Sequence, residues 1–277
     1  MTGTVTLQCM NDASMQKLPR ESRFVDLSDY ARPLAIRLVN LLRPYRVVTP
    51  VKVTLAGAIV GLVAAALIWN GKWLLFAGLL LPARSWIDAA DGSLARARNR
   101  PSQVGRFFDS FCDFFVHLLL FQAFAHYNNQ SAALAFVAFL CAVFQASVYN
   151  YYHVIKRHAC AGDRTSEIDQ RAPPEPYPWD NPAALKFLHT SYLVFYWWQD
   201  RLAYLLDPGA IEHGGRLTSR FLTALSALAM GFQLLVMCLL LWVGRSDVVL
   251  FYFAVPAMLY TLGLIGYRRF FLTRRSG

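Results

Sequence analysis

The sequence predicts an all-α integral membrane protein with six transmembrane helices, preceded by an amphipathic helix in the membrane interface. Three observations support this prediction. The 277 residues are 56% apolar and 14% aromatic, which is too apolar for an ordinary soluble domain. Apolar stretches of membrane length recur along the chain. Basic residues gather on one side of the membrane in the topology that these stretches define.

Six apolar stretches are long enough to cross a bilayer as helices, which requires about 20 residues each. We expect them at about 52–70, 73–97, 104–126, 132–155, 220–243 and 248–267. Residues 1–25 are polar and lack the short apolar core of a cleaved signal peptide, so we expect a polar tail there. The rest of the chain, 26–277, is predicted to form one membrane domain.

The basic residues predict the orientation. With both termini in the cytosol, three short connections face outward, near 70–72, 127–131 and 244–247. Of the 27 Lys and Arg, these connections contain only Lys72 and Arg245. This positive-inside pattern places the connection between the second and third spans in the cytosol; in a bacterium the membrane would be the cell inner membrane. The net charge of +10 therefore indicates attraction to anionic lipid and not to nucleic acid.

Two segments outside the spans are expected at the cytosolic face. A helix beginning near Asp29 and Pro33 carries an apolar stripe that includes Leu34 and Leu38, which suits the membrane interface. The proline-rich stretch at about 157–184 is predicted to be a cytosolic loop.

The aromatic-rich segment 185–206 has two interpretations. A seventh span would turn the basic C-terminal residues outward, against the positive-inside pattern. We therefore favour an interfacial or partly inserted helix whose aromatic residues form a belt. The cluster Tyr192–Trp198 could instead hold a quaternary ammonium group by cation–π contacts.

Four aspartates interrupt the second and third predicted spans: Asp88, Asp91, Asp109 and Asp113. A carboxylate at the centre of a membrane helix costs about 2.5–3.5 kcal/mol on insertion scales, so four of them indicate a function. A bound divalent cation is the simplest explanation, because it turns mutually repelling carboxylates into ligands. Oxygen ligands of this kind suit Mg²⁺ or Mn²⁺.

Helical spacing can bring these groups together. Asp88, Asp91 and Ala95 share one stripe of a helix, and residues 105, 109 and 113 share a stripe of the next. Two antiparallel helices can thus direct four carboxylates at one point, where two ions would bind both the attacking and the leaving oxygens of a phosphoryl transfer. Small residues at 92, 95 and 105 leave room for a nucleotide, and Arg96 offers planar donors to phosphate.

The fixed positions read Asp88-x2-Asp91-Gly92-x2-Ala95-Arg96-x8-Gly105-x3-Asp109-x3-Asp113. This pattern resembles the signature of the CDP-alcohol phosphatidyltransferase family at every position. With residue usage of about one in twenty, a chance match in this chain is on the order of 10⁻⁸. One departure precedes it: Val51, in Pro50-Val51-Lys52-Val53-Thr54, stands where family members often carry Asn.

The resemblance implies specific roles. Asp88, Asp91 and Asp109 would hold two Mg²⁺ or Mn²⁺ ions, with Asp113 as a further ligand and the general base. The CDP site would be lined by Asp91, Gly92, Ala95, Arg96 and Gly105. The implied reaction transfers a phosphatidyl group from CDP-diacylglycerol to the hydroxyl of a small alcohol and releases CMP. A homodimer is also implied.

Several alternatives stay open. The same metal centre could transfer phosphocholine or phosphoethanolamine from its CDP form to diacylglycerol, and a transporter or scaffold could use an acidic cation site. Arg84 could pair with Asp88 one turn away or contact a substrate, and we favour the pairing. His117 is expected to be an interior histidine with its polar groups satisfied. Lys156 and Arg157 could bind an anionic acceptor or a lipid headgroup.

Overall fold

The computed structural model describes residues 18–160, 170–212 and 214–272. Within these ranges the chain is helical and contains no strand, which confirms the all-α prediction. The main helices are α2 (Arg32–Leu42), α3 (Pro50–Trp69), α4 (Leu74–Ala97), α5 (Gln103–Tyr127), α6 (Ala132–Ala159), α7 (Pro182–Tyr192), α8 (Trp198–Leu206), α9 (Ser219–Leu225), α10 (Met230–Trp242), α11 (Val249–Ala254) and α12 (Pro256–Tyr267).

Local sequence explains where the helices begin. The hydroxyl of Thr49 accepts a hydrogen bond from the Lys52 amide and precedes Pro50, so α3 starts with a cap and a proline in its first turn. Ser102 caps α5 in the same way by accepting from the Gly105 amide at 2.9 Å. Asn181 accepts from two backbone amides at the start of α7.

Four helical segments are long and apolar enough to cross a membrane: Pro50–Trp69, Gln103–Tyr127, Ala132–Ala159 and Ser246–Phe270. A fifth is formed if the segments Ser219–Leu228 and Met230–Trp242, bent by 55° at their junction, are taken together. The bend coincides with extended backbone at Ala229. Helix α4 has 24 residues and comparable length, but the charged residues of the motif make it less apolar.

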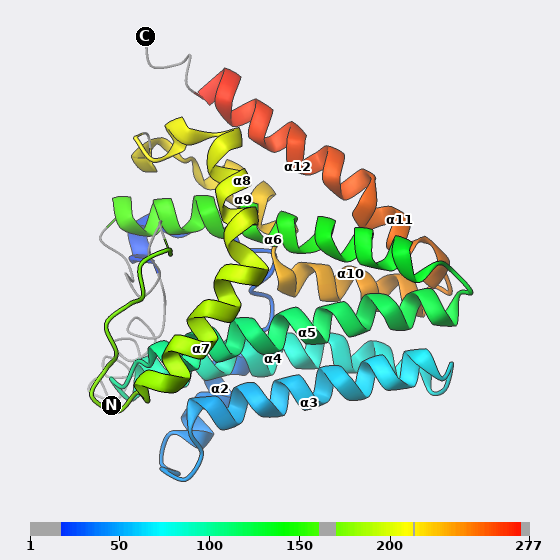
Figure 1. Ribbon diagram of the computed structural model, residues 1–277, viewed down its shortest axis with the longest axis horizontal. Coiled ribbons are helices and arrows are strands. Elements are labelled where there is room, and N and C mark those ends of the chain that lie inside the picture. Colours follow the sequence, from blue (N-terminus) through cyan, green and yellow to red (C-terminus); the bar gives the residue numbers. More distant parts are fainter. Residues whose placement is uncertain (1–17, 161–169, 213, 273–277) are drawn as a thin grey trace, which may run out of the picture.

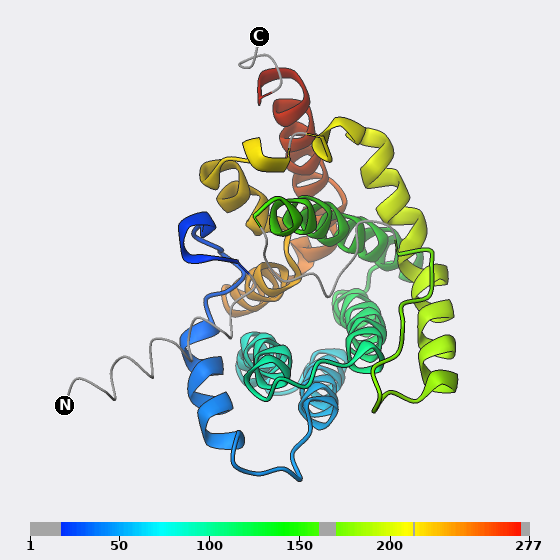
Figure 2. The same cartoon turned by 90° about the vertical axis from the view of Figure 1, so that its left-hand side faces the viewer.

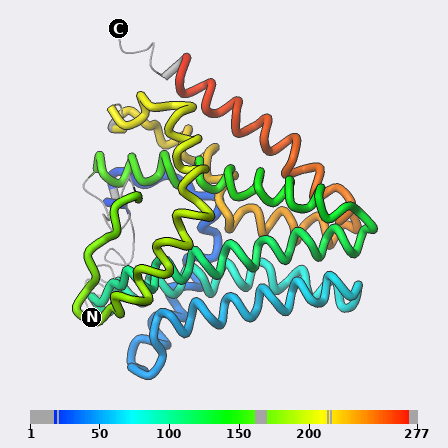
Figure 3. The backbone as a smooth tube through the Cα atoms, in the orientation of Figure 1, coloured from blue at the N-terminus to red at the C-terminus, as the bar shows by residue number. Residues whose placement is uncertain are grey.

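The long helices lie side by side, as Figures 1 and 3 show for α3 to α6 and α10. Both α4 and α5 pack mainly against α3, and α10 packs against the other side of α4. A large apolar core fills the bundle, with Phe121, Phe124 and Phe139 fully buried. The motif lies at the end of the bundle where α4 finishes and α5 begins.

Two segments cross this end of the bundle instead of running along it. The continuous helical segment α7, η2 (Leu193–Trp197) and α8 runs obliquely across the long helices in Figure 1. In Figure 2, which looks along the long helices from the motif end, α2 lies on the opposite side of the bundle from this segment. Arg98 fixes the loop that follows α2, because its guanidinium donates to the carbonyls of Leu42 and Tyr45.

The bounds of the predicted loop and of the predicted tail differ from those of the structure or lie partly outside it. Helix α6 continues to Ala159, so the predicted loop at 157–184 begins later, and residues 161–169 of it lie outside the described residues. Most of the predicted polar tail, 1–17, also lies outside them.

Candidate metal centre

Three carboxylates converge at the motif end of α4 and α5. Asp88 and Asp91 come from α4 and Asp109 comes from α5, and each offers one oxygen within 4.8 Å of the others. Asp91 is buried and the other two are partly buried. The spacing of three residues on α4 places its two aspartates on one face, as the sequence predicts.

The chemistry of this donor set fits a divalent cation. One carboxylate oxygen of Asp109 is buried and has no hydrogen-bond partner in the described part of the chain. Three carboxylates this close repel one another, and burial in a medium of low dielectric strengthens the repulsion. A hard cation that takes oxygen ligands, such as Mg²⁺ or Mn²⁺, would relieve both problems.

Asp91 is held in place by neighbouring groups. The Thr54 hydroxyl of α3 donates to one carboxylate oxygen, and the Gly92 amide donates to the other. Thr54 is buried, so this contact orients Asp91 from the neighbouring helix. Thr54 is a site residue that the helical spacing of the aspartates could not reveal, although it belongs to the sequence pattern around Val51.

The fourth aspartate is arranged differently. Asp113 lies on α5 one turn after Asp109, and its Oδ1 forms an ion pair with Nη2 of Arg84 on α4. The predicted ion pair between Arg84 and Asp88 is therefore wrong for the contacts that the structure describes. The guanidinium contacts Asp113 on the neighbouring helix α5 instead. Asp113 is not one of the three carboxylates that converge.

The predicted nucleotide-binding positions lie on α4 and α5, the two helices that carry the converging aspartates. A Cβ atom built on Gly92 would lie 3.4 Å from Arg96 Nη1, and one built on Gly105 would lie 3.4 Å from Ser102 and 3.8 Å from Val51 Cγ2. A Cβ atom would therefore be in ordinary contact at both positions, so packing among the described residues does not require glycine there. Ala95, on the same helix, is partly exposed.

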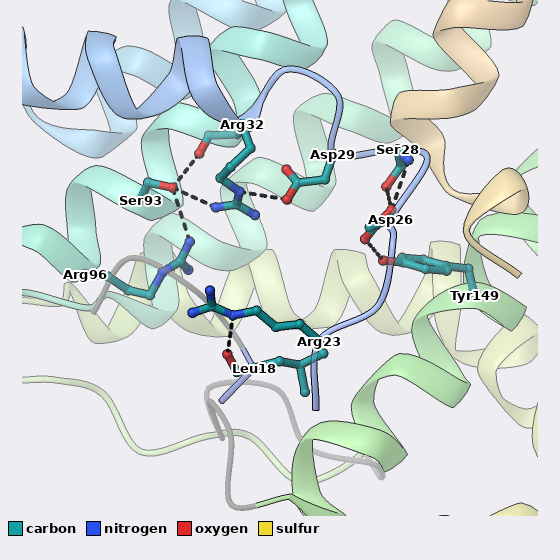
Figure 4. Close-up of polar contacts among 10 residues, drawn as sticks. Leu18, Arg23, Asp26, Ser28, Asp29, Arg32, Ser93, Arg96 and Tyr149 are labelled. Carbon is teal, nitrogen blue, oxygen red and sulfur yellow. Dashed lines mark hydrogen bonds and ion pairs between the residues drawn. The ribbon is translucent and has the colours of Figure 1, made fainter. Parts of the chain in front are cut away.

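A second arginine lies beside Arg96. Arg96 donates to Ser93 Oγ at 3.4 Å, and Arg32, at the start of α2, donates to the same oxygen at 3.2 Å. Figure 4 shows both guanidinium groups reaching Ser93, with Arg32 also paired to Asp29 at 2.8 Å. The helix α2 thus contributes a cation next to the motif.

The remaining candidate residues have structural contacts. His117 is buried, and its Nε2 lies 3.2 Å from Gln233 Oε1, while its Nδ1 has no partner among the described residues. Its polar groups are therefore only partly satisfied. Lys156 donates to the Leu217 carbonyl at 3.2 Å. Arg157, also considered for an anionic acceptor, is buried.

The aromatic segment packs on α5. Phe195 stacks on Phe114 with ring centroids 4.3 Å apart, and the Tyr196 hydroxyl donates to the Ser110 carbonyl at 3.0 Å. Tyr192 donates to Asp200 at 2.7 Å. These rings cover the outer side of the helix that carries Asp109 and Asp113.

Comparison with known proteins places the motif in a family. The family model described as CDP-alcohol phosphatidyltransferase matches residues 47–199, which is more than half of the chain and includes all four aspartates of the motif. A search of curated proteins finds no match to this chain.

Proposed function

The chain belongs to the CDP-alcohol phosphatidyltransferase family, an enzyme family of phosphotransferases, and from this premise we propose that it moves a phosphatidyl group from CDP-diacylglycerol to a small alcohol. The observation that carries the proposal is the convergence of Asp88, Asp91 and Asp109 within the matched region. Family membership favours an enzyme over a cation transporter or scaffold.

Three aspartates would hold two Mg²⁺ or Mn²⁺ ions: Asp88, Asp91 and Asp109, with Asp113 at their side as a further ligand. When bound, such ions stabilise the charge that develops on phosphate oxygens during transfer. Thr54 keeps the Asp91 carboxylate oriented for this role. The small residues Gly92, Ala95 and Gly105 leave space for the CDP moiety, and Arg96 lies where its guanidinium can donate to a phosphate.

The proposed reaction is a direct displacement. Asp113 accepts the proton of the acceptor hydroxyl, and the oxygen forms a bond to the phosphorus that carries diacylglycerol. The bond between that phosphorus and the bridging oxygen of the diphosphate breaks, and CMP leaves with the bridging oxygen. Binding both substrates beside one another supplies the proximity that the step requires.

The membrane placement belongs to the same proposal. Helix α4 and the bent pair α9–α10 would join the four apolar helical segments to give six spans, with both termini and the site in the cytosol, at the inner membrane in a bacterium. Helix α2 and the segment α7–α8 would lie in the interface. Large apolar residues of this segment are exposed, including Phe187, Val194 and Leu205, as expected for side chains facing lipid. The active unit would be a homodimer.

The test is CMP release by purified protein in detergent with Mg²⁺ or Mn²⁺. CDP-diacylglycerol is offered with glycerol 3-phosphate, serine, inositol, inositol phosphate or choline, and CDP-choline and CDP-ethanolamine are offered with diacylglycerol in parallel. Release that depends on CDP-diacylglycerol and one acceptor, and that is lost in Asp113→Asn, supports the proposal. Release only from CDP-choline or CDP-ethanolamine would contradict the proposed donor.

A further inference from the structure

A buried arginine in an apolar helix requires an explanation. The side chain of Arg84 is 3% exposed, and a guanidinium keeps its charge in proteins. Buried ion pairs contribute little net stability, because desolvation offsets much of the attraction. A gain in stability therefore does not explain why an arginine is buried at position 84. Charged residues inside membrane helices generally serve a function.

Within the described part of the chain, Arg84 forms one ion pair. Its Nη2 donates to Asp113 Oδ1, and its Nε has no hydrogen-bond partner in the described ranges. Among the described residues, the carboxylate that Arg84 contacts directly is therefore that of Asp113, the aspartate of the motif outside the converging group, while Asp88 and Asp109 act on it electrostatically.

The helix α3 is shaped to admit this arginine. A Cβ atom on Gly61 would lie 2.7 Å from Arg84 Cδ and 2.8 Å from Arg84 Nε. One turn earlier on the same helix, a Cβ on Gly57 would meet its nearest atom, of Ile87, at 3.4 Å, an ordinary contact. Val116 Cγ1 would be closer still, at 2.4 Å, so the space at Gly61 is filled by the side chains of Val116 and Arg84 together.

The geometry of Asp113 matches the role proposed for it. Oδ1 is bound by Arg84, whereas no donor from the described residues contacts Oδ2, and the side chain is 17% exposed. One oxygen is thus fixed and the other is open to a substrate.

We propose that Arg84 is a positioning residue for Asp113. By binding Oδ1 it fixes the rotation of the carboxylate, so that Oδ2 can face the acceptor hydroxyl. This inference rests on the proposed function, in which Asp113 accepts the proton.

The test compares Arg84→Met and Arg84→Lys with Asp113→Asn and with the double variant Arg84→Met/Asp113→Asn. A positioned general base contributes about 10²–10⁴-fold, so a base that has lost its orientation is expected to lower kcat by about 10–100-fold. KM for the CDP-alcohol should stay within about twofold, because only the orientation of the base changes. Lysine should restore part of kcat, since it supplies the charge without the planar donors. The double variant should equal Asp113→Asn.

Metal binding provides a readout independent of catalysis. The increase in unfolding temperature that Mn²⁺ alone produces should be the same in wild type and Arg84→Met, because the three converging aspartates are intact. Asp91→Asn is the matched control and should lose this increase. If Arg84→Met does not fold, the same three quantities are measured on Arg84→Lys: kcat, KM and the increase in unfolding temperature that Mn²⁺ produces.

Each outcome has one meaning. Unchanged kcat in both arginine variants would overturn the inference, as would a loss of the Mn²⁺ response that parallels the loss of kcat. The inference would also be overturned if kcat of the double variant were lower than that of Asp113→Asn by the full factor seen in Arg84→Met alone. If the wild type releases no CMP from any substrate pair, the proposed function is wrong. That result is obtained without the arginine variants and is therefore distinct from a failure of the inference about Arg84.

Discussion

The substitution Gly61→Ala tests how closely the helix packing controls the site. The added Cβ would lie 2.4 Å from Val116 Cγ1, 2.7 Å from Arg84 Cδ and 2.8 Å from Arg84 Nε. These separations are about 0.6–1.0 Å shorter than an ordinary contact of 3.4 Å, so neighbouring atoms must move. Overpacking of this kind costs about 1–3 kcal/mol. Because Arg84 is one of the groups that must move, we expect Asp113 to lose its orientation.

The magnitude follows from the strain. If about 1.4 kcal/mol of this strain is added to the activation free energy, kcat falls about tenfold. The measurements are CMP release and thermal unfolding in detergent, each made on Gly61→Ala and on Gly57→Ala. The control adds the same methyl group to the same helix at an ordinary distance of 3.4 Å from Ile87, so its kcat should be unchanged. Its stability should be equal or slightly higher, since alanine favours helix by about 0.8–1.0 kcal/mol over glycine.

Two results would refute this reasoning. Gly61→Ala with wild-type kcat and stability would show that the helices adjust without affecting the site. An equal loss of kcat in Gly57→Ala would show that the effect comes from helix α3 in general and not from the space around Arg84.

Three further predictions concern the nucleotide site, the buried ion pair and the interface. Gly92→Ala and Gly105→Ala should keep or slightly raise the unfolding temperature, because the new Cβ would meet its nearest neighbour at 3.4 Å and alanine favours helix. KM for the CDP-alcohol should rise, and an unchanged KM would exclude close approach by the nucleotide. Arg268→Met should lower the free energy of unfolding by about 3–5 kcal/mol, since it leaves Asp207 buried without its cation, and kcat of the folded fraction should be retained. Brominated lipid in vesicles should quench tryptophan fluorescence, and Trp198→Phe should reduce this quenching if α8 lies in the interface; equal quenching would contradict that placement.

Much of the fold and the converging carboxylates could be predicted from local sequence. Helical spacing alone places Asp88 beside Asp91, and the apolar stretches predict most of the long helices. These features depend on short-range periodicity, which is visible in a single sequence. The roles of Asp113 as a base and of Gly92 and Gly105 in nucleotide binding remain predictions.

Contacts between helices could not be predicted in the same way. Spacing on one helix predicts that Arg84 lies beside Asp88. In the assembled bundle, Arg84 of α4 instead forms its ion pair with Asp113 of α5. Both helices pack on α3, where Gly61 leaves space for the side chains of Val116 and Arg84. The break at Ala229 is equally hidden, because the residues around it are as apolar as an unbroken helix. Such features depend on groups that meet only after the bundle assembles.

The ion pair between Asp207 and Arg268 has a consequence for biogenesis. The two residues are 61 positions apart, and the carboxylate is 2% exposed in the finished protein, where the Tyr152 hydroxyl also donates to it at 2.7 Å. A ribosome completes Asp207 and most of the membrane helices long before it completes the arginine. The aspartate therefore gains its cation only when the segment η7 (Arg268–Leu272), which follows α12, docks, and this makes the docking a late step of assembly. Truncation before Arg268 would leave the Asp207 carboxylate buried without its cation.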